Sequence, residues 1–164
     1  MAMAKIAERE GMCVDVVSGG ELYTALKAGF PPERIEFNGN NKLPDELRLA
    51  VKNGIGRIIV DGFSELERIE EICKEENRRI SVLFRVTPGI KADSHDYIVT
   101  GKKDSKFGFP LDDEVLQDQI SRAIQSEYID FKGLHFHIGS QLFDNGPYLQ
   151  ALDIILELTK KIRE

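Results

Sequence analysis

The chain alternates short apolar runs with longer amphipathic segments. The runs are rich in β-branched and aromatic residues, and each is followed by apolar residues at the three- and four-residue spacing of a helix. The pattern predicts strands at residues 13–17, 35–38, 57–61, 80–86 and 131–138. It predicts helices at residues 1–10, 18–29, 44–54, 64–73 and 112–126, and from residue 147 onward. Ser-x-x-Glu capping boxes are expected to begin the helices at Ser18 and Ser64.

Strand–helix units of about twenty residues predict a parallel sheet with right-handed crossovers. An open doubly wound sheet and a (β/α)8 barrel both fit this α/β pattern. Polar residues near the carboxyl ends of successive strands favour the barrel, which gathers those ends at one mouth: Ser18, Asn38, Asp61, Arg85 and His137. With five strands, the chain is expected to form part of a barrel. The alternatives are an open five-stranded domain and a half-barrel that closes with a second copy.

The segment GLHFHIGSQ at residues 133–141 is the strongest site candidate. Apolar residues alternate with His135 and His137, so the two imidazoles share one face of the expected strand. The strand runs into Gly139 and Ser140, which free the backbone and offer a hydroxyl group. A buried strand with two hydrogen-bonded histidines is the alternative, but two histidines on one face beside a Gly-Ser turn favour a site.

Arg85 is expected on the inward face of its strand, where its charge needs an acceptor. That acceptor is either Asp15 or Asp61 in an internal salt bridge, or a bound anion. The two glycines of the segment 18–21 cost helix stability, and close approach of a ligand or of neighbouring backbone would explain them. The long segment 87–110 is either a solvated loop or a lid or subunit contact.

Composition narrows the function classes. The chain has 164 residues, a net charge of −6 and a pI near 5.2, which argue against binding to nucleic acid. No apolar run approaches the ~20 residues of a membrane span, and residues 1–11 lack the features of a signal peptide. Cys13 and Cys73 are expected to be buried reduced thiols of a cytoplasmic protein. The His-x-His pair lacks further ligands, because His95 is the third histidine and no acidic residue completes a set, so no metal site is expected.

Five segments together resemble the diaminopimelate decarboxylase branch of the alanine-racemase-like, fold type III pyridoxal-phosphate decarboxylases. They are DVVSGGEL at 15–22, GFPPERIEFNGN at 29–40, RVTPGI at 85–90, DSKFG at 104–108 and GLHFHIGSQ at 133–141. The resemblance implies pyridoxal 5'-phosphate as cofactor. His137 would stack on its pyridine ring, Ser140 with the backbone of Gly139 would bind its phosphate, and Arg85 would lie near its phenolic oxygen.

The same resemblance implies further roles. Asp15 would face the region of the cofactor lysine, Glu21 would support it, and His135 would lie just behind the cofactor contacts. Lys106 would lie at a dimer contact, because family active sites are shared between two subunits. The implied reaction converts meso-diaminopimelate, a small amino-acid substrate, to L-lysine and CO2.

Several family features have no counterpart in this sequence. The lysine that forms the Schiff base is expected before Met1, and the later phosphate loop and the C-terminal β domain are missing. Residues 1–164 are therefore expected to be family strands two to six, a pyridoxal-phosphate-binding barrel domain incomplete at both ends. Alone, this piece is expected to be inactive and to bind the cofactor weakly. It is also expected to be poorly stable or to self-associate through the unpaired edges of the strands at 13–17 and 131–138, with Val17, Ile59 and Leu83 of the inner face meeting water. The alternatives are an arginine or ornithine decarboxylase of the same family and a noncatalytic half-barrel interaction domain.

Overall fold

The computed structural model describes residues 1–90, 106–111 and 114–163. Helices and strands alternate along them as the apolar pattern predicts. The helices are α1 (Ala2–Arg9), α2 (Gly19–Ala28), α3 (Pro44–Asn53), α4 (Phe63–Glu76), α5 (Glu114–Gln125) and α6 (Gly146–Arg163), with a short 3-10 helix at Pro32–Arg34. The strands are β1 (Val14–Val16), β2 (Ile35–Phe37), β3 (Arg57–Val60), β4 (Ile80–Thr87), β5 (Phe109–Pro110) and β6 (Ile129–His135).

The strands form one parallel sheet. Its order is β1-β2-β3-β4, with β6 beside β4, so the five strands expected from the sequence are parallel and in chain order, as predicted. The sixth strand, β5, was not predicted. It pairs with the end of β4 through Val86 and Phe109, and a two-residue strand that contains proline carries no periodic signal.

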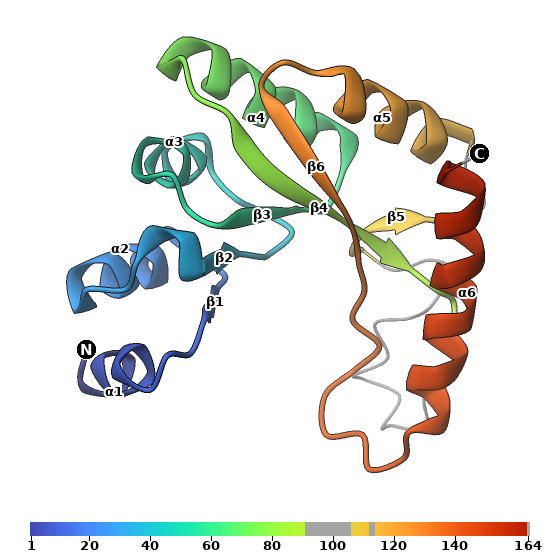
Figure 1. Ribbon diagram of the computed structural model, residues 1–164, viewed down its shortest axis with the longest axis horizontal. Coiled ribbons are helices and arrows are strands. Elements are labelled where there is room, and N and C mark those ends of the chain that lie inside the picture. The colour runs from blue at the N-terminus through green and yellow to red at the C-terminus, as the bar shows by residue number, and fades with distance from the viewer. Residues whose placement is uncertain (91–105, 112–113, 164) are drawn as a thin grey trace.

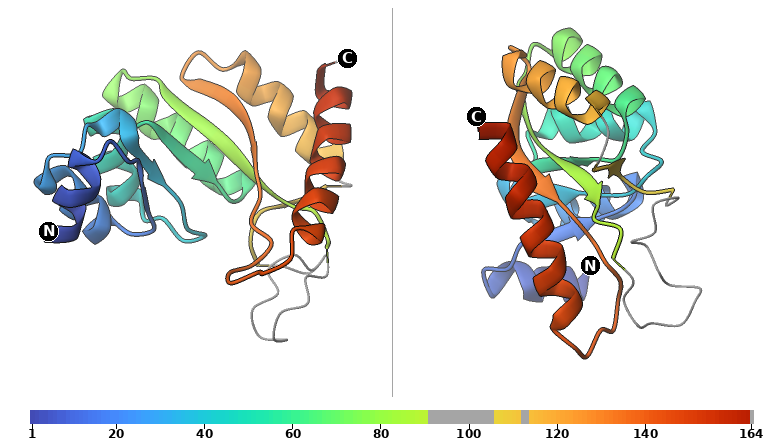
Figure 2. Two further views of the ribbon diagram at one scale, coloured as in Figure 1. Left: turned by 60° about the horizontal axis from the view of Figure 1, so that its bottom comes forward. Right: turned by 90° about the vertical axis from the view of Figure 1, so that its right-hand side faces the viewer.

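The sheet curves, and α2, α3, α4 and α5 follow one another around its outer side (Figure 1). The left view in Figure 2 shows the same arc, with the N-terminus and α6 at its two ends. This arrangement of parallel strands inside and helices outside is that of an incomplete (β/α)8 barrel. The core between the two layers is apolar and includes the fully buried residues Phe37, Ile58, Leu66, Phe84 and Leu116.

A β-bulge interrupts β6. Phe131 pairs with Val82 of β4, and Gly133 pairs with the next residue, Leu83, so Lys132 is an extra residue in the ladder. Gly133 has φ +137°, a backbone conformation that favours glycine. Simple alternation from Phe131 would place that ring on the same face as His135. The bulge instead keeps Phe131 on the core side, where its ring lies 5.1 Å from that of Phe84.

Two predicted boundaries were wrong. The site strand ends at His135 rather than at Ile138, so His137 follows the strand. Helix α4 begins at Phe63 with Gly62 as N-cap, so Ser64 lies inside the helix and does not cap it. The carboxylate of Glu65 is used differently, because its Oε2 accepts a hydrogen bond of 2.7 Å from the amide of Asp61.

The predicted cap at Ser18 is confirmed. Its Oγ accepts a hydrogen bond from the amide of Glu21, and the Glu21 carboxylate accepts one from the amide of Val17. A Cβ atom on Gly19 would lie 2.7 Å from the Cγ atom of Glu46, whose Oε1 accepts a hydrogen bond from the Gly19 amide. A side chain of α3, rather than a ligand or neighbouring backbone, therefore explains this glycine.

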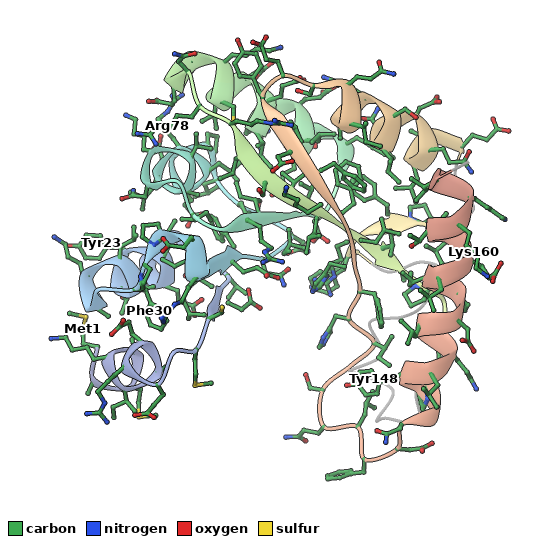
Figure 3. All side chains as sticks on the ribbon, viewed as in Figure 1. Met1, Tyr23, Phe30, Arg78, Tyr148 and Lys160 are labelled. Carbon is green, nitrogen blue, oxygen red and sulfur yellow. The ribbon has the colours of Figure 1, made fainter. Side chains whose placement is uncertain are left out.

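Helix α6 buries one side and exposes the other. Ala151, Ile155 and Leu158 are buried, whereas Tyr148 and Lys160, labelled in Figure 3, project from the helix into solvent. None of the helices in the described ranges is long and apolar enough to cross a membrane.

The exposure of individual side chains shows that two further expectations about burial were wrong in part. Cys13 is exposed and only Cys73 is buried. Of the three apolar residues expected to meet water on the inner face, Val17 is 57% exposed and Leu83 is partly buried, but Ile59 is fully buried.

Candidate functional site

A cavity of about 500 Å³ opens where the carboxyl ends of the strands meet. This volume lies within the ~300–1,000 Å³ that small-molecule sites commonly occupy. Its lining combines polar and apolar surface. It comes from β1, β4 and β6, from the segments that follow β1, β2 and β6, and from the segment before β5: Asp15, Val17, Asn38, Gly39, Asn40, Asn41, Arg85, Phe107, His135 and His137. The sequence-based expectation that successive strand ends meet at one mouth is confirmed for Asn38, Arg85 and His137.

The pairing of β4 with β6 places Arg85 beside His135, since these two residues are register partners. Both line the cavity, whereas Leu134 and Phe136 pack against the apolar core. The prediction that the histidines face inward and the apolar residues outward is therefore confirmed. The bulge at Lys132 makes this possible, because the half of β6 before it packs its own apolar residues on the core side.

Arg85 is a buried cation at the cavity wall. Its Nε lies 3.9 Å from Oδ1 of Asp61, and its guanidinium carbon lies 4.5 Å from the centre of the Phe107 ring. Burial lowers the pKa of Arg85, and the negative charges of Asp61 and Asp15 oppose that change. Asp61 is thus the internal acidic neighbour expected from the sequence, and a bound anion beside Arg85 stays a prediction.

The two histidines are biased toward the neutral form. Burial lowers the pKa of His135 to about 4, and the positive charges of Arg85 and His137 act in the same direction. Desolvation and Arg85 also lower the pKa of His137, while Asp15 opposes the change. The Nδ1 atom of His135 is buried and has no hydrogen-bond partner within the described part of the chain, so the cavity wall holds an unused polar atom.

Asp15 supplies the carboxylate of the cavity lining. Burial raises its pKa, and a hydrogen bond from Nδ2 of Asn38, at 3.5 Å, acts against that increase. The cavity therefore combines one acid, one cation, two neutral imidazoles and several amides. Such a set suits a small polar ligand that carries both negative charge and hydrogen-bonding groups.

The other predicted site residues lie nearby without lining the cavity. Gly139 is buried with φ +141°, and Ser140, exposed, follows it. Glu21 caps the backbone after β1, as described above. Lys106 is exposed, and its Nζ lies 5.1 Å from the centre of the Phe107 ring. His95, weighed as a metal ligand, and most of the proposed lid lie outside the described residues.

Sequence reasoning missed part of the cavity wall. Asn40, Asn41 and Phe107 line it, and Lys42 is buried directly behind it. The run of three asparagines and a lysine directly after β2 was an available signal, because polar residues that follow a strand of a parallel sheet lie at its site edge. No group of three or more potential metal ligands occurs in residues 1–90, 106–111 and 114–163.

Parallel strands inside a layer of helices, with charged and imidazole groups at the strand ends, are typical of barrel proteins that bind a small molecule at the barrel mouth. Residues 1–164 match the family described as pyridoxal-dependent decarboxylase, pyridoxal binding domain. The chain belongs to this family.

Known relatives narrow the similarity within the family. The diaminopimelate decarboxylase of Bacillus subtilis is 50% identical over 164 residues, which are 100% of this chain and 37% of that protein. The crystal structure of diaminopimelate decarboxylase from Helicobacter pylori, complexed with L-lysine, is 34% identical with a TM-score of 0.92, and covers 98% of this chain and 40% of that one. The enzyme from M. jannaschii, also with L-lysine, is 36% identical with a TM-score of 0.85, over 98% of this chain and 38% of that one. The chain thus spans well under half the length of these relatives.

Proposed function

We propose that this chain is the cofactor-binding part of a diaminopimelate decarboxylase, which converts meso-diaminopimelate to L-lysine and CO2. The observation that carries the proposal is the cavity at the strand ends, where Asp15, Arg85, His135 and His137 meet. Identity of 50% to a relative of that name, over the whole chain, supports this substrate over arginine or ornithine.

The residues at the cavity fit pyridoxal 5'-phosphate. The cation of Arg85 suits an oxyanion, and the buried Nδ1 of His135 is an unused hydrogen-bonding atom on the same wall. We propose that His137 stacks on the pyridine ring, that Arg85 lies near the phenolic oxygen, and that Ser140 and the Gly139 backbone bind the phosphate. Asp15 would face the cofactor lysine, with Glu21 supporting it.

When bound, pyridoxal phosphate supplies an electron sink for the negative charge left on the substrate carbon after CO2 departs. The chain's own residues bind and orient the cofactor. Arg85 keeps a positive charge at the wall, and the low pKa of His135 keeps that imidazole neutral near pH 7, so it adds no second cation beside Arg85. Among the described residues that line the cavity there is no lysine, so we assign no covalent step to this part of the chain.

The test is CO2 release by the protein that carries this chain, with meso-diaminopimelate, L-ornithine and L-arginine compared at equal concentration. We expect release from meso-diaminopimelate alone. Faster turnover of ornithine or arginine would overturn the substrate assignment.

A second measurement tests the cofactor residues. Arg85→Gln should weaken binding of pyridoxal phosphate about tenfold or more, because a buried charge-assisted contact is worth about 1.5–3 kcal/mol. The control is Arg122→Gln, which removes a surface cation paired with Glu67 and Glu70 far from the cavity. Equal affinity in the Arg85 variant and the wild type would contradict the placement of the cofactor.

We also propose that the protein acts as a homodimer in the cytoplasm, with Lys106 at the dimer contact. Lys106 is exposed next to Phe107, a cavity residue, so a second copy bound there would lie close to the site. Two free cysteines fit a reducing compartment. Sedimentation of Lys106→Glu against wild type tests the contact: a shift toward monomer is expected, and an unchanged dimer would place the contact elsewhere.

The chain by itself is proposed to associate through exposed strand edges and apolar side chains, including Met12 and Val17, each 57% exposed. Light scattering across a range of protein concentrations tests this, with growth of the apparent mass expected. A monomer at every concentration would show the proposal wrong.

A further inference from the structure

A buried charged group lies behind the cavity wall rather than in it. The Nζ of Lys42 donates three short hydrogen bonds: 2.6 Å to the carbonyl of Gly39, 2.7 Å to the carbonyl of Ile59 and 2.7 Å to Oε1 of Glu65. These three acceptors belong to the loop after β2, the end of β3 and the first turn of α4. One ammonium group therefore joins three elements that are separate in the sequence.

The contacts continue from Glu65 to the cavity wall. The second oxygen of Glu65 accepts from the amide of Asp61 at 2.7 Å. The carboxylate of Asp61 in turn accepts from the amide of Gly108 at 2.7 Å and lies 3.9 Å from Nε of Arg85. We call Lys42, Glu65 and Asp61 the Lys42 network.

None of the three network residues lines the cavity, but Lys42 and Asp61 each contact a segment that does, and Glu65 joins the two. Lys42 holds the loop 39–41, and Asp61 holds both Arg85 and the segment that carries Phe107. Asp61 and Arg85 have side chains that are only 6% and 9% exposed, so this contact is shielded from solvent. The network thus connects the loop 39–41, Arg85 and the segment that carries Phe107 from behind the cavity.

We propose that the Lys42 network is a positioning device, which fixes the loop 39–41 and Arg85 in the geometry that binds the ligand. The proposal depends on the proposed function in one respect, which is that it takes pyridoxal phosphate as that ligand. Apolar residues of similar size often stabilise a fold as well as a buried ion pair does, whereas an ion pair also fixes direction and distance. The three directed bonds of Lys42 act on a loop whose residues matter to the cavity.

The double variant Lys42→Met, Glu65→Leu removes both charges of the ion pair and so leaves no single buried charge unpaired. Ile120→Val, a change in the core of α5, is the control for a general loss of stability. Asp61→Asn retains an oxygen that can accept from Gly108 but removes the negative charge near Arg85. If the double variant does not fold, Lys42→Met, Glu65→Gln replaces it, because this pair also removes both charges while a glutamine can still accept the hydrogen bond from the amide of Asp61.

Two readouts separate positioning from stability. The first is hydrogen exchange of the segment 38–42 without ligand, which should rise about tenfold in the double variant and stay unchanged in Ile120→Val. The second is the pyridoxal phosphate concentration for half-maximal activity in the protein that carries the chain. It should rise fivefold or more in the double variant and in Asp61→Asn, while kcat at saturating cofactor changes less than twofold.

Two outcomes would overturn the proposal: exchange and cofactor affinity that match the wild type, or changes equal to those in Ile120→Val. Failure of the proposed function looks different. In that case the wild type neither binds pyridoxal phosphate nor releases CO2, and exchange of the segment 38–42 alone then decides for or against the network.

Discussion

Acidification should destabilise the fold through His135. The pKa of this imidazole is about 4 in the folded chain, against an ordinary value near 6.5 that applies to the unfolded chain. A histidine whose pKa is lowered by folding contributes stability that is fully present above pH 6.5, because neither state then binds the proton. The contribution is lost as the pH falls from 6.5 toward 4, since only the unfolded chain takes up the proton in that range.

The magnitude follows from the two pKa values. Between pH 7 and pH 5, proton uptake by His135 stabilises the unfolded chain relative to the folded chain. The difference is equivalent to about 1.4 pKa units, or about 2 kcal/mol. This is a large part of the ~5–15 kcal/mol that stabilises an ordinary domain. Carboxyl groups such as Asp15 and Asp61, whose pKa values are raised by desolvation, act in the opposite direction as they take up protons. The contribution of His135 must therefore be isolated by comparison.

Urea unfolding of the wild type and of His135→Gln at pH 7, 6 and 5 provides that comparison. The wild type should lose about 2 kcal/mol more than the variant over this range, because the other titrating groups are common to both. Imidazole NMR signals give a direct check, with His135 titrating near pH 4 in the folded chain. Parallel pH profiles for the two proteins, or titration of His135 above pH 6, would refute the burial argument.

Three substitutions test the packing around the site. Gly108→Ala should cost about 1–3 kcal/mol in urea unfolding, because φ is +73° and the new Cβ would lie 2.7 Å from the carbonyl oxygen of Arg85; full wild-type stability would contradict that geometry. Phe109→Ala should cost about 3–5 kcal/mol, since its ring is buried against two others, and a loss below 1 kcal/mol would show that β5 does not pack as described. Gly19→Ala should cost about 1 kcal/mol by displacing Glu46 from the Gly19 amide, and it should cost almost nothing in a Glu46→Ala background.

Sequence periodicity predicted the main course of the fold. The β-branched runs and the three-to-four spacing were enough to predict five parallel strands and the helices between them, because burial of one face dictates both patterns. The face of His135 and the inward position of Arg85 were also predictable. Each depends on alternation along a strand, a local property of the chain.

Contacts between distant segments were not predictable in this way. Lys42 looks like an ordinary loop lysine, and its burial depends on Ile59 and Glu65, which lie 17 and 23 residues away. Ser64 and Glu67 match a capping pattern, but the carboxylate that binds the backbone before α4 is that of Glu65. Such choices are decided by tertiary contacts that compete with a local rule, and the rule alone cannot show which one is formed.

The bulge in β6 has a consequence for how sequences of this kind should be aligned. Because Lys132 is an extra residue in the ladder, the alternation of side chains between the two faces starts anew after it. One piece of the strand ends at Phe131, and the other begins at Gly133. Loss of that single residue would give an unbroken ladder with Phe131 still on the core side and His135 still facing the cavity. A one-residue gap at this point in a comparison of relatives is therefore neutral for the site, whereas the same gap two residues later, at Leu134, would turn His135 away from the cavity.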